Sequence, residues 1–206
     1  LPLPDKPSIA VLPFTNMSGD PKQEYFSDGL TDQIIGGLSK VPNLFVIARN
    51  STFTYKGKPV KVQKVAEDLG VSYVLEGSVQ KTADRIRITA QLIDATTGHH
   101  LWSERYDRDP EDIFAIQDEI TMEIMKAMRV KLTRGEQARL WGKHETTNLA
   151  AYEKYLEGRA YLLRFTKEDN AQGRQLLEEA IALDTGFAGA YAFLGWSHFF
   201  DARFGW

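Results

Sequence analysis

The first half of the chain alternates short apolar runs with a segment of helical periodicity. The run SIAVLPF at 8–14 predicts a buried strand, and LFVIAR at 44–49 predicts a second buried strand. Between them, apolar side chains recur every fourth residue, the spacing of one helix face: Phe26, Leu30, Ile34 and Leu38. Gly29 interrupts this segment and leaves open one helix or two short consecutive helices. This order of elements indicates an α/β fold.

The periodicity changes from helical to alternating after residue 70. VQKVAEDLG at 62–70 predicts a short helix that ends on a C-cap glycine. Three strand-like runs follow, joined by the hairpin-type turns TAD and ATTG: SYVLEGSVQK (72–81), RIRITAQLID (85–94) and HHLWSERYD (99–107). The middle run places Ile86, Ile88, Ala90 and Leu92 on one side and Arg87, Thr89 and Gln91 on the other. Antiparallel hairpins with one wet face are therefore predicted.

The rest of the chain is helical in pattern. Residues 109–132 predict a long helix capped by Asp109, and its buried stripe consists of Ile113, Ile116, Ile120, Ile124 and Met128. The polar segment 133–148 is typical of a connector. Beyond it, YLEGRAY at 155–161 is echoed by FLGWSHF at 193–199, with a small residue, Ala180, between them where two helices would pack closely. This spacing is near the ~34-residue period of tetratricopeptide (TPR) repeats.

These patterns predict an α/β (α+β) sandwich-like module with a mixed sheet and C-terminal antiparallel hairpins, followed by an all-α TPR-like helical segment. The expected segments are a linker at 1–7, the α/β domain at 8–132, a connector at 133–149 and truncated TPR-like repeats at 150–206. Because the sequence starts at Leu1 without an initiator Met and stops inside an aromatic run, we expect it to be part of a longer protein.

Composition narrows the classes of function. The 206 residues carry a net charge of −3, with basic and acidic residues mixed, whereas nucleic-acid binding needs a concentrated basic face. The chain has no cysteine, which excludes disulfides, thiolate catalysis and Cys-ligated zinc. Apolar runs are all shorter than the ~20 residues of a membrane span. We therefore expect no nucleic-acid partner and no membrane insertion by this segment.

The loop NMSGDP at 16–21 raises the question of a phosphate site. A P-loop needs a lysine and a Ser/Thr after its last glycine, whereas here Gly19 is followed by Asp20 and Pro21. The aspartate would repel a phosphate, and the proline lacks an amide donor. The same residues suit a helix start, with Asp20 as N-cap and Gln23 at the capping-box position.

Acidic side chains recur every four residues along the following helix: Asp20, Glu24, Asp28 and Asp32. Such a stripe suits either a metal or acid–base site or, more simply, a cap and a solvated helix face. His99 and His100 are adjacent on or beside a strand, so they point to opposite faces and do not suit one metal. We predict no metal, no cofactor and no catalytic residue.

A small anion site is a further expectation. In an open α/β sheet, ligands bind beyond the carboxyl ends of the strands. The loops that follow the first two predicted strands carry polar and basic side chains that would gather there: Asn16, Ser18, Arg49, Ser51, Lys56 and Lys58. The alternative is a hydrogen-bonded loop with solvated lysines.

Several stretches in order resemble one bacterial module: KPSIAVLPFTNMSGDPKQEYFSDGLTDQI, LFVIARNSTFTYKGK, VAEDLGVSYVLEGSVQK, RIRITAQLIDATTGHHLWSERYDR and EDIFAIQDEIT. The module is the TolB amino-terminal-like (FlgO/CsgG-related) α/β domain, and the resemblance covers about 6–132. It implies TPR repeats downstream and an upstream class III adenylate/guanylate cyclase or a winged-helix regulator. It also implies that this segment lies in the bacterial cytoplasm, or on the periplasmic side of a membrane-anchored parent protein.

The resemblance implies a non-catalytic sensory or protein-interaction segment of a signalling protein, such as the C-terminal region of a cyclase. The alternative functions are a small-ligand (anion or nucleotide) receptor that controls an attached output domain, and an enzyme that uses the acidic stripe. Protein or peptide partners are expected on the TPR-like helices. Apolar side chains there would also give a homodimer of this fragment: Tyr191, Leu194, Phe199, Phe200, Phe204 and Trp206.

Overall fold

The computed structural model describes residues 6–130 and 145–206 of the chain. The chain folds into two compact units, Leu1–Lys143 and His144–Trp206. Most of the predicted connector lies outside the described residues. The domain boundaries given above therefore stay predictions.

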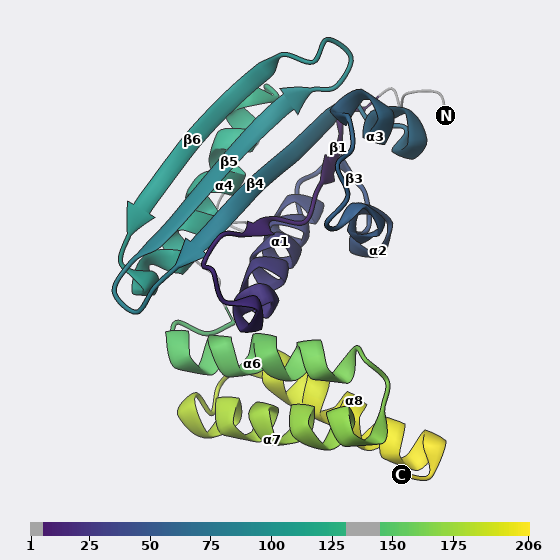
Figure 1. Ribbon diagram of the computed structural model, residues 1–206, viewed down its shortest axis with the longest axis vertical. Helices are drawn as coiled ribbons and strands as arrows, with labels where there is room; N and C mark the ends of the chain where they lie inside the picture. Colours follow the sequence, from purple (N-terminus) through teal and green to yellow (C-terminus); the bar gives the residue numbers. More distant parts are fainter. Residues whose placement is uncertain (1–5, 131–144) are drawn as a thin grey trace. The chain divides into compact units, whose positions relative to one another are not determined.

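The described part of the first unit is built on a six-stranded mixed sheet (Figure 1). Its strands are β1 (Ser8–Val11), β2 (Thr15–Asn16), β3 (Phe45–Val46), β4 (Tyr73–Lys81), β5 (Ile86–Asp94) and β6 (His100–Arg108). The order is β3-β1-β4-β5-β6, and the short β2 pairs with β4. β1 is parallel to β3 and β4, whereas β4, β5 and β6 form antiparallel hairpins. The predicted mixed sheet with C-terminal hairpins is confirmed.

Helices cover the two faces of this sheet unequally. α1 (Glu24–Ser39) and α4 (Ile113–Ala127) contact each other and share one face, where the predicted apolar stripes of both helices are buried. α3 (Val62–Leu69) packs on the opposite face, against Ala10, Leu12 and Val74. The one-turn α2 (Arg49–Thr52) and the 3₁₀ turns η1 (Pro21–Gln23), η2 (Phe53–Tyr55) and η3 (Pro110–Asp112) complete the unit.

The segment 44–49 differs from the prediction of a buried strand. Only Phe45–Val46 is a strand, it lies at the edge of the sheet, and the Phe45 side chain is half exposed. The chain turns into α2 at Arg49, because Ala48 in an extended conformation already serves as its N-cap. The apolar run was therefore too short a signal to separate an edge strand from a central one.

The other elements follow their sequence patterns, with changes at the ends. Gly29 does not break α1, which is one 16-residue helix. The Asp20 carboxylate accepts a hydrogen bond from the Lys22 amide at 2.9 Å, as expected of an N-cap, but the Gln23 amide oxygen has no partner among the described residues. The helix predicted at 109–132 ends at Ala127, and Arg129 beyond it adopts a left-handed φ of 55°.

The second unit contains three described helices: α6 (Leu149–Leu162), α7 (Lys167–Leu183) and α8 (Ala188–Phe204). Asn148 and Thr166 cap α6 and α7 through their side chains, each accepting a hydrogen bond from a backbone amide. α6 and α7 approach each other at two glycines, Gly158 and Gly173. Ala180 is fully buried. The helical segment is thus present, whereas its assignment as TPR repeats stays a prediction.

Of the helices in the described ranges, each is too short or too polar to span a lipid bilayer.

Candidate functional site

Two of the predicted anion-binding cations lie on the acidic stripe of α1. The Lys56 ammonium is 2.9 Å from a Glu24 carboxylate oxygen and 2.6 Å from Asp28, and the Arg49 guanidinium is 3.7 Å from Asp32. The Arg49 guanidinium also stacks on the Phe53 ring at 3.7 Å. Features that the sequence presented separately therefore form one ion-pair network, which holds the 49–56 segment on α1.

Asp28 is a partly buried carboxylate of this network. Burial raises the pKa of its carboxyl, and the hydrogen bond and charge of Lys56 oppose that rise. Removing a carboxylate from water is unfavourable unless a cation compensates. Lys56 supplies that compensation, so we interpret the stripe as a structural clamp.

The clamp weakens the case for an anion site at Arg49 and Lys56. Three carboxylates, Glu24, Asp28 and Asp32, face these two cations, so the local charge is negative. An incoming anion would meet repulsion as well as attraction.

Asn16 and Ser18 shape their own loop. The Asn16 side-chain amide donates to the Asp20 carbonyl at 2.9 Å, and the Ser18 hydroxyl accepts from the Lys81 amide at 2.9 Å. Ser51 is exposed at the end of α2, and Lys58 lies in the loop beyond η2. The six predicted ligand-binding residues thus do not converge on one pocket, and binding by any of them stays a prediction.

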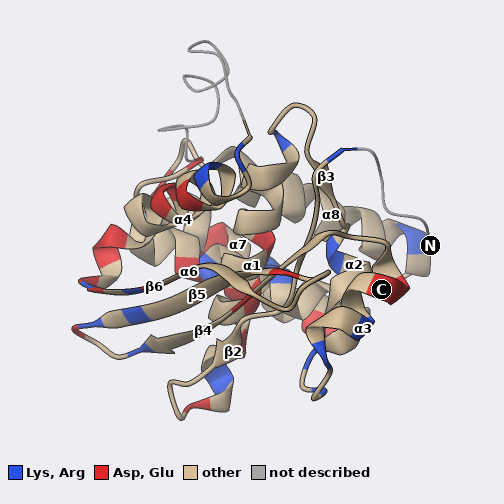
Figure 2. Ribbon diagram, turned by 90° about the horizontal axis from the view of Figure 1, so that it is seen from above, with Lys and Arg blue, Asp and Glu red and all other residues tan. Residues whose placement is uncertain are grey.

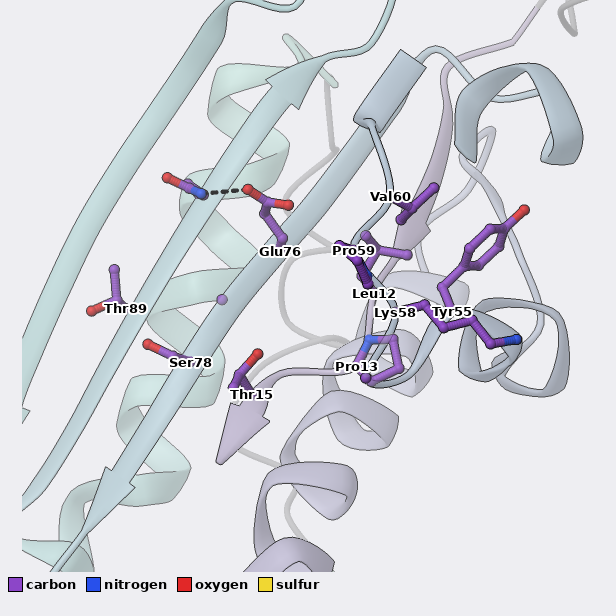
Figure 3. Close-up of a pocket in the computed structure, with 13 residues that line it drawn as sticks. Leu12, Pro13, Thr15, Tyr55, Lys58, Pro59, Val60, Glu76, Ser78 and Thr89 are labelled. Atoms are coloured by element: carbon purple, nitrogen blue, oxygen red, sulfur yellow. Dashed lines mark hydrogen bonds between the residues drawn. The ribbon is translucent and has the colours of Figure 1, made fainter. Parts of the chain in front are cut away.

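A cavity of about 500 Å³ lies on the sheet face that α1 and α4 leave uncovered. Figure 3 shows it between β4, β5 and the loop that leads from α2 to α3. Lys58 is the one predicted site residue that lines it. The other lining residues are Leu12, Pro13, Thr15, Tyr55, Gly57, Pro59, Val60, Glu76, Gly77, Ser78, Thr89 and Gln91.

Strand register places the polar residues of this cavity in two rows. Thr15 is paired with Ser78, and Ser78 is paired with Thr89, so three hydroxyl side chains lie side by side across β2, β4 and β5. In the next row, Glu76 is paired with Gln91, whose side-chain amide donates to the Glu76 carboxylate at 2.5 Å. Paired residues share a face, and neighbouring strands are ~4.8 Å apart.

This cavity was not predicted from the sequence. Thr89 and Gln91 were placed on a wet face by their alternation, but the pairing partners of that face depend on the register between strands far apart in sequence. Thr15 gave no signal, because β2 has only two residues.

The histidine and acidic residues form no metal site among the described residues. Basic and acidic residues are interspersed over the described strands and helices in Figure 2.

The apolar side chains predicted to form an interaction surface at the C-terminal helix are exposed only in part, and their role in binding stays a prediction. Tyr191, Phe199 and Phe204 are about half exposed, whereas Leu194 and Trp206 are partly buried. The exposure of Phe200 was predicted wrongly: its side chain is buried and its ring packs 5.3 Å from that of Phe165. Trp196, which the prediction omitted, is 58% exposed.

With this geometry described, the chain can be compared with known proteins. Residues 5–124 match the family described as "HilA/YgeH-like transcriptional regulator, second domain". The chain belongs to this family. The match covers the sheet and the helices α1 to α3 and most of α4, so the cavity lies within the family domain.

A curated protein of Rhizobium meliloti (strain 1021) named "Putative adenylate cyclase 3" is 55% identical over 192 residues. The alignment covers 93% of this chain and 32% of that protein, so the chain spans about a third of its relative. The predicted relationship to a protein named as an adenylate cyclase is confirmed. TPR repeats and a relationship to FlgO/CsgG stay predictions.

Among solved structures, the chain is similar to TolB from Acinetobacter baumannii, with a TM-score of 0.45 and 20% identity over 62% of this chain and 29% of TolB. Lipoprotein GNA1162 from Neisseria meningitidis has a TM-score of 0.44 and 18% identity over 58% of this chain and 99% of that protein. Both scores are below 0.5, so the fold assignment depends on the topology described above.

Proposed function

We propose that this chain is a non-catalytic sensory and protein-interaction segment of a bacterial signalling protein, and that its output domain is an adenylate cyclase. One observation carries the proposal: the same module is similar to part of a protein named as an adenylate cyclase and to a domain of transcriptional regulators. A module shared by proteins with different outputs is expected to control the output and not to perform it.

The acidic stripe is the strongest catalytic candidate in the sequence, and its contacts support the proposal. Lys56 and Arg49 engage Glu24, Asp28 and Asp32. Carboxylates held in ion pairs position a loop, and each of these three already has a cation as its partner.

The first experiment measures cyclic AMP formation by the purified chain with ATP and Mg²⁺ or Mn²⁺. We expect none above the rate without protein. Turnover by the chain itself would end the proposal.

The second experiment uses the full-length Rhizobium relative and a version that lacks the region aligned with this chain. We expect the deletion to change the cyclase rate severalfold, whereas equal rates would show that the segment does not regulate. In the full-length protein that contains this chain, Asp28→Asn tests the enzymatic alternative, because the cyclase rate should be unchanged if Asp28 only holds Lys56.

A further inference from the structure

The cavity on the open sheet face is lined by hydroxyl groups that have no hydrogen-bond partner within the described ranges 6–130 and 145–206. Among the residues that the structure describes, none makes a hydrogen bond to the hydroxyls of Thr15, Ser78 and Thr89. All three side chains are at least partly exposed, and in Figure 3 they follow one another across the strands. Each hydroxyl can donate one hydrogen bond and accept others. The row therefore offers a ligand several donors and acceptors at strand spacing.

The second row adds a carboxylate and an amide. Gln91 donates to one oxygen of Glu76, which orients both side chains and leaves further acceptor sites on the carboxylate. A carboxylate accepts hydrogen bonds from hydroxyl groups but repels anions. The strand floor of the cavity thus favours a ligand that donates hydrogen bonds and carries no negative charge.

The remaining wall is apolar and faces the floor. It consists of Leu12, Pro13, Pro59, Val60 and the ring of Tyr55, whose hydroxyl is held at 3.2 Å from the Asp68 carboxylate. The one cation of the lining, Lys58, is exposed, and Figure 3 shows its amino group pointing away from the strands. Such a wall suits the C–H surface of a ring and not a phosphate.

We infer that this cavity binds a neutral polyhydroxylated small molecule, such as a monosaccharide or a cyclitol. Its hydroxyls would bridge the row Thr15–Ser78–Thr89 and donate to Glu76, while its ring lies against Tyr55 and the prolines. A cavity of about 500 Å³ is within the usual range for small-molecule sites. This inference deepens the proposed sensory role, since it names the class of molecule that would be sensed.

The loop that closes the cavity is also the loop held by the ion-pair network. Lys56 contacts α1, and two residues later Lys58 lines the cavity. A ligand that orders the 55–60 loop would therefore act on residues bonded to α1. Ligand binding in the cavity could in this way affect α1, which lies on the opposite face of the sheet.

The test titrates the purified chain with D-glucose, D-ribose and myo-inositol, and separately with inorganic phosphate and AMP, by ligand-observed NMR. We expect saturable binding of at least one neutral probe, and weaker or no binding of both anions. Failure of all three neutral probes to saturate at about 10 mM, tenfold above a Kd of 1 mM, would overturn the inference. Tighter binding of phosphate or AMP would overturn it as well.

Variants then locate the binding. Thr89→Val and Ser78→Ala remove hydroxyls at nearly constant shape, and each should raise the Kd about tenfold, as expected for a lost hydrogen bond. Ser103→Ala is the matched control. Ser103 lies on β6 and is paired with Gln91 of β5, but it does not line the cavity. Its Kd should equal that of the wild type. Unchanged binding in both cavity variants would place the ligand elsewhere and reject the site.

Folding of each variant is checked by circular dichroism. If one hydroxyl variant does not fold, the Kd of the Glu76→Gln variant is measured instead, and it should also rise, because the carboxylate that accepts from the ligand is lost. The outcome also separates the site from the proposed function. If the chain binds a neutral probe but the full-length cyclase does not respond to it, the site stands and the sensory role falls. If the deletion described above changes the cyclase rate but no probe binds, the regulatory role stands and this site falls.

Discussion

Gly77 in β4 lies where the backbone of β5 and an aromatic ring leave no room for a side chain. A Cβ at this position would be 2.7 Å from the Phe14 ring and would also collide with the Thr89 carbonyl. Phe14 is itself almost fully buried, and its amide donates to the Thr31 hydroxyl at 2.9 Å. The glycine therefore permits β1–β2, α1 and the hairpin to meet at one point.

We predict that Gly77→Ala destabilises the first unit by about 2–3 kcal/mol, since overpacking a core typically costs 1–3 kcal/mol and here part of the clash is with backbone. Chemical denaturation measures the change. Gly36→Ala is the control, because Gly36 is exposed in α1 with no atom within 4 Å of the added Cβ. It should be neutral or stabilising by up to ~1 kcal/mol. A Gly77→Ala protein as stable as the wild type would contradict the close approach.

At the scale of elements, the contact between α6 and α7 depends on two facing glycines. A Cβ on Gly173 would be 2.8 Å from the Gly158 carbonyl, and a Cβ on Gly158 would be 3.0 Å from the Gly173 carbonyl. Both helices therefore pack backbone against backbone at this level. Leu162, Leu176 and Leu177 surround the contact and are buried.

We predict that Gly173→Ala forces α6 and α7 apart and lowers the stability of the second unit by roughly 1–3 kcal/mol, despite the higher helix propensity of alanine. Thermal unfolding followed by circular dichroism at 222 nm reports the loss. Gly195→Ala in α8 serves for comparison, since a Cβ there meets nothing within 4 Å. If both variants unfold at the same or a higher temperature than the wild type, the glycine contact is not a constraint.

At the scale of the whole molecule, the exposed aromatic side chains of α8 predict self-association. Tyr191, Trp196, Phe199 and Phe204 are each about half exposed, and large exposed apolar patches are typical of interaction surfaces. We expect a symmetric dimer through these helices. Light scattering of the chain at high micromolar concentration should give twice the monomer mass. The double variant Trp196→Ser/Phe199→Ser should give the monomer mass, and a dimer that persists in it would place the contact elsewhere.

The predictability of the fold and of the site also depends on scale. The stripe from Phe26 to Leu38 and the alternation in β5 are local patterns, and both correctly identified the buried faces. The partners of Asp28 and Asp32 could not be predicted, because they depend on how the 49–56 segment returns to α1. The hydroxyl row depends on the register of β2 and β5 on β4, a property of the assembled sheet.

The ion-pair network has a consequence for the evolution of the family. Lys56 is the cation that contacts both Glu24 and Asp28, so a change of Lys56 alone would leave these two carboxylates without their ion-pair partner, and Asp28 is partly buried. A buried charge that loses its partner costs several kcal/mol, whereas replacing both partners together costs much less. We therefore expect paired substitutions at 28 and 56 to be tolerated better than a substitution of Lys56 alone. Related sequences that lack the lysine at position 56 should also lack the aspartate at position 28. Residue identities at the two positions should therefore covary across the family.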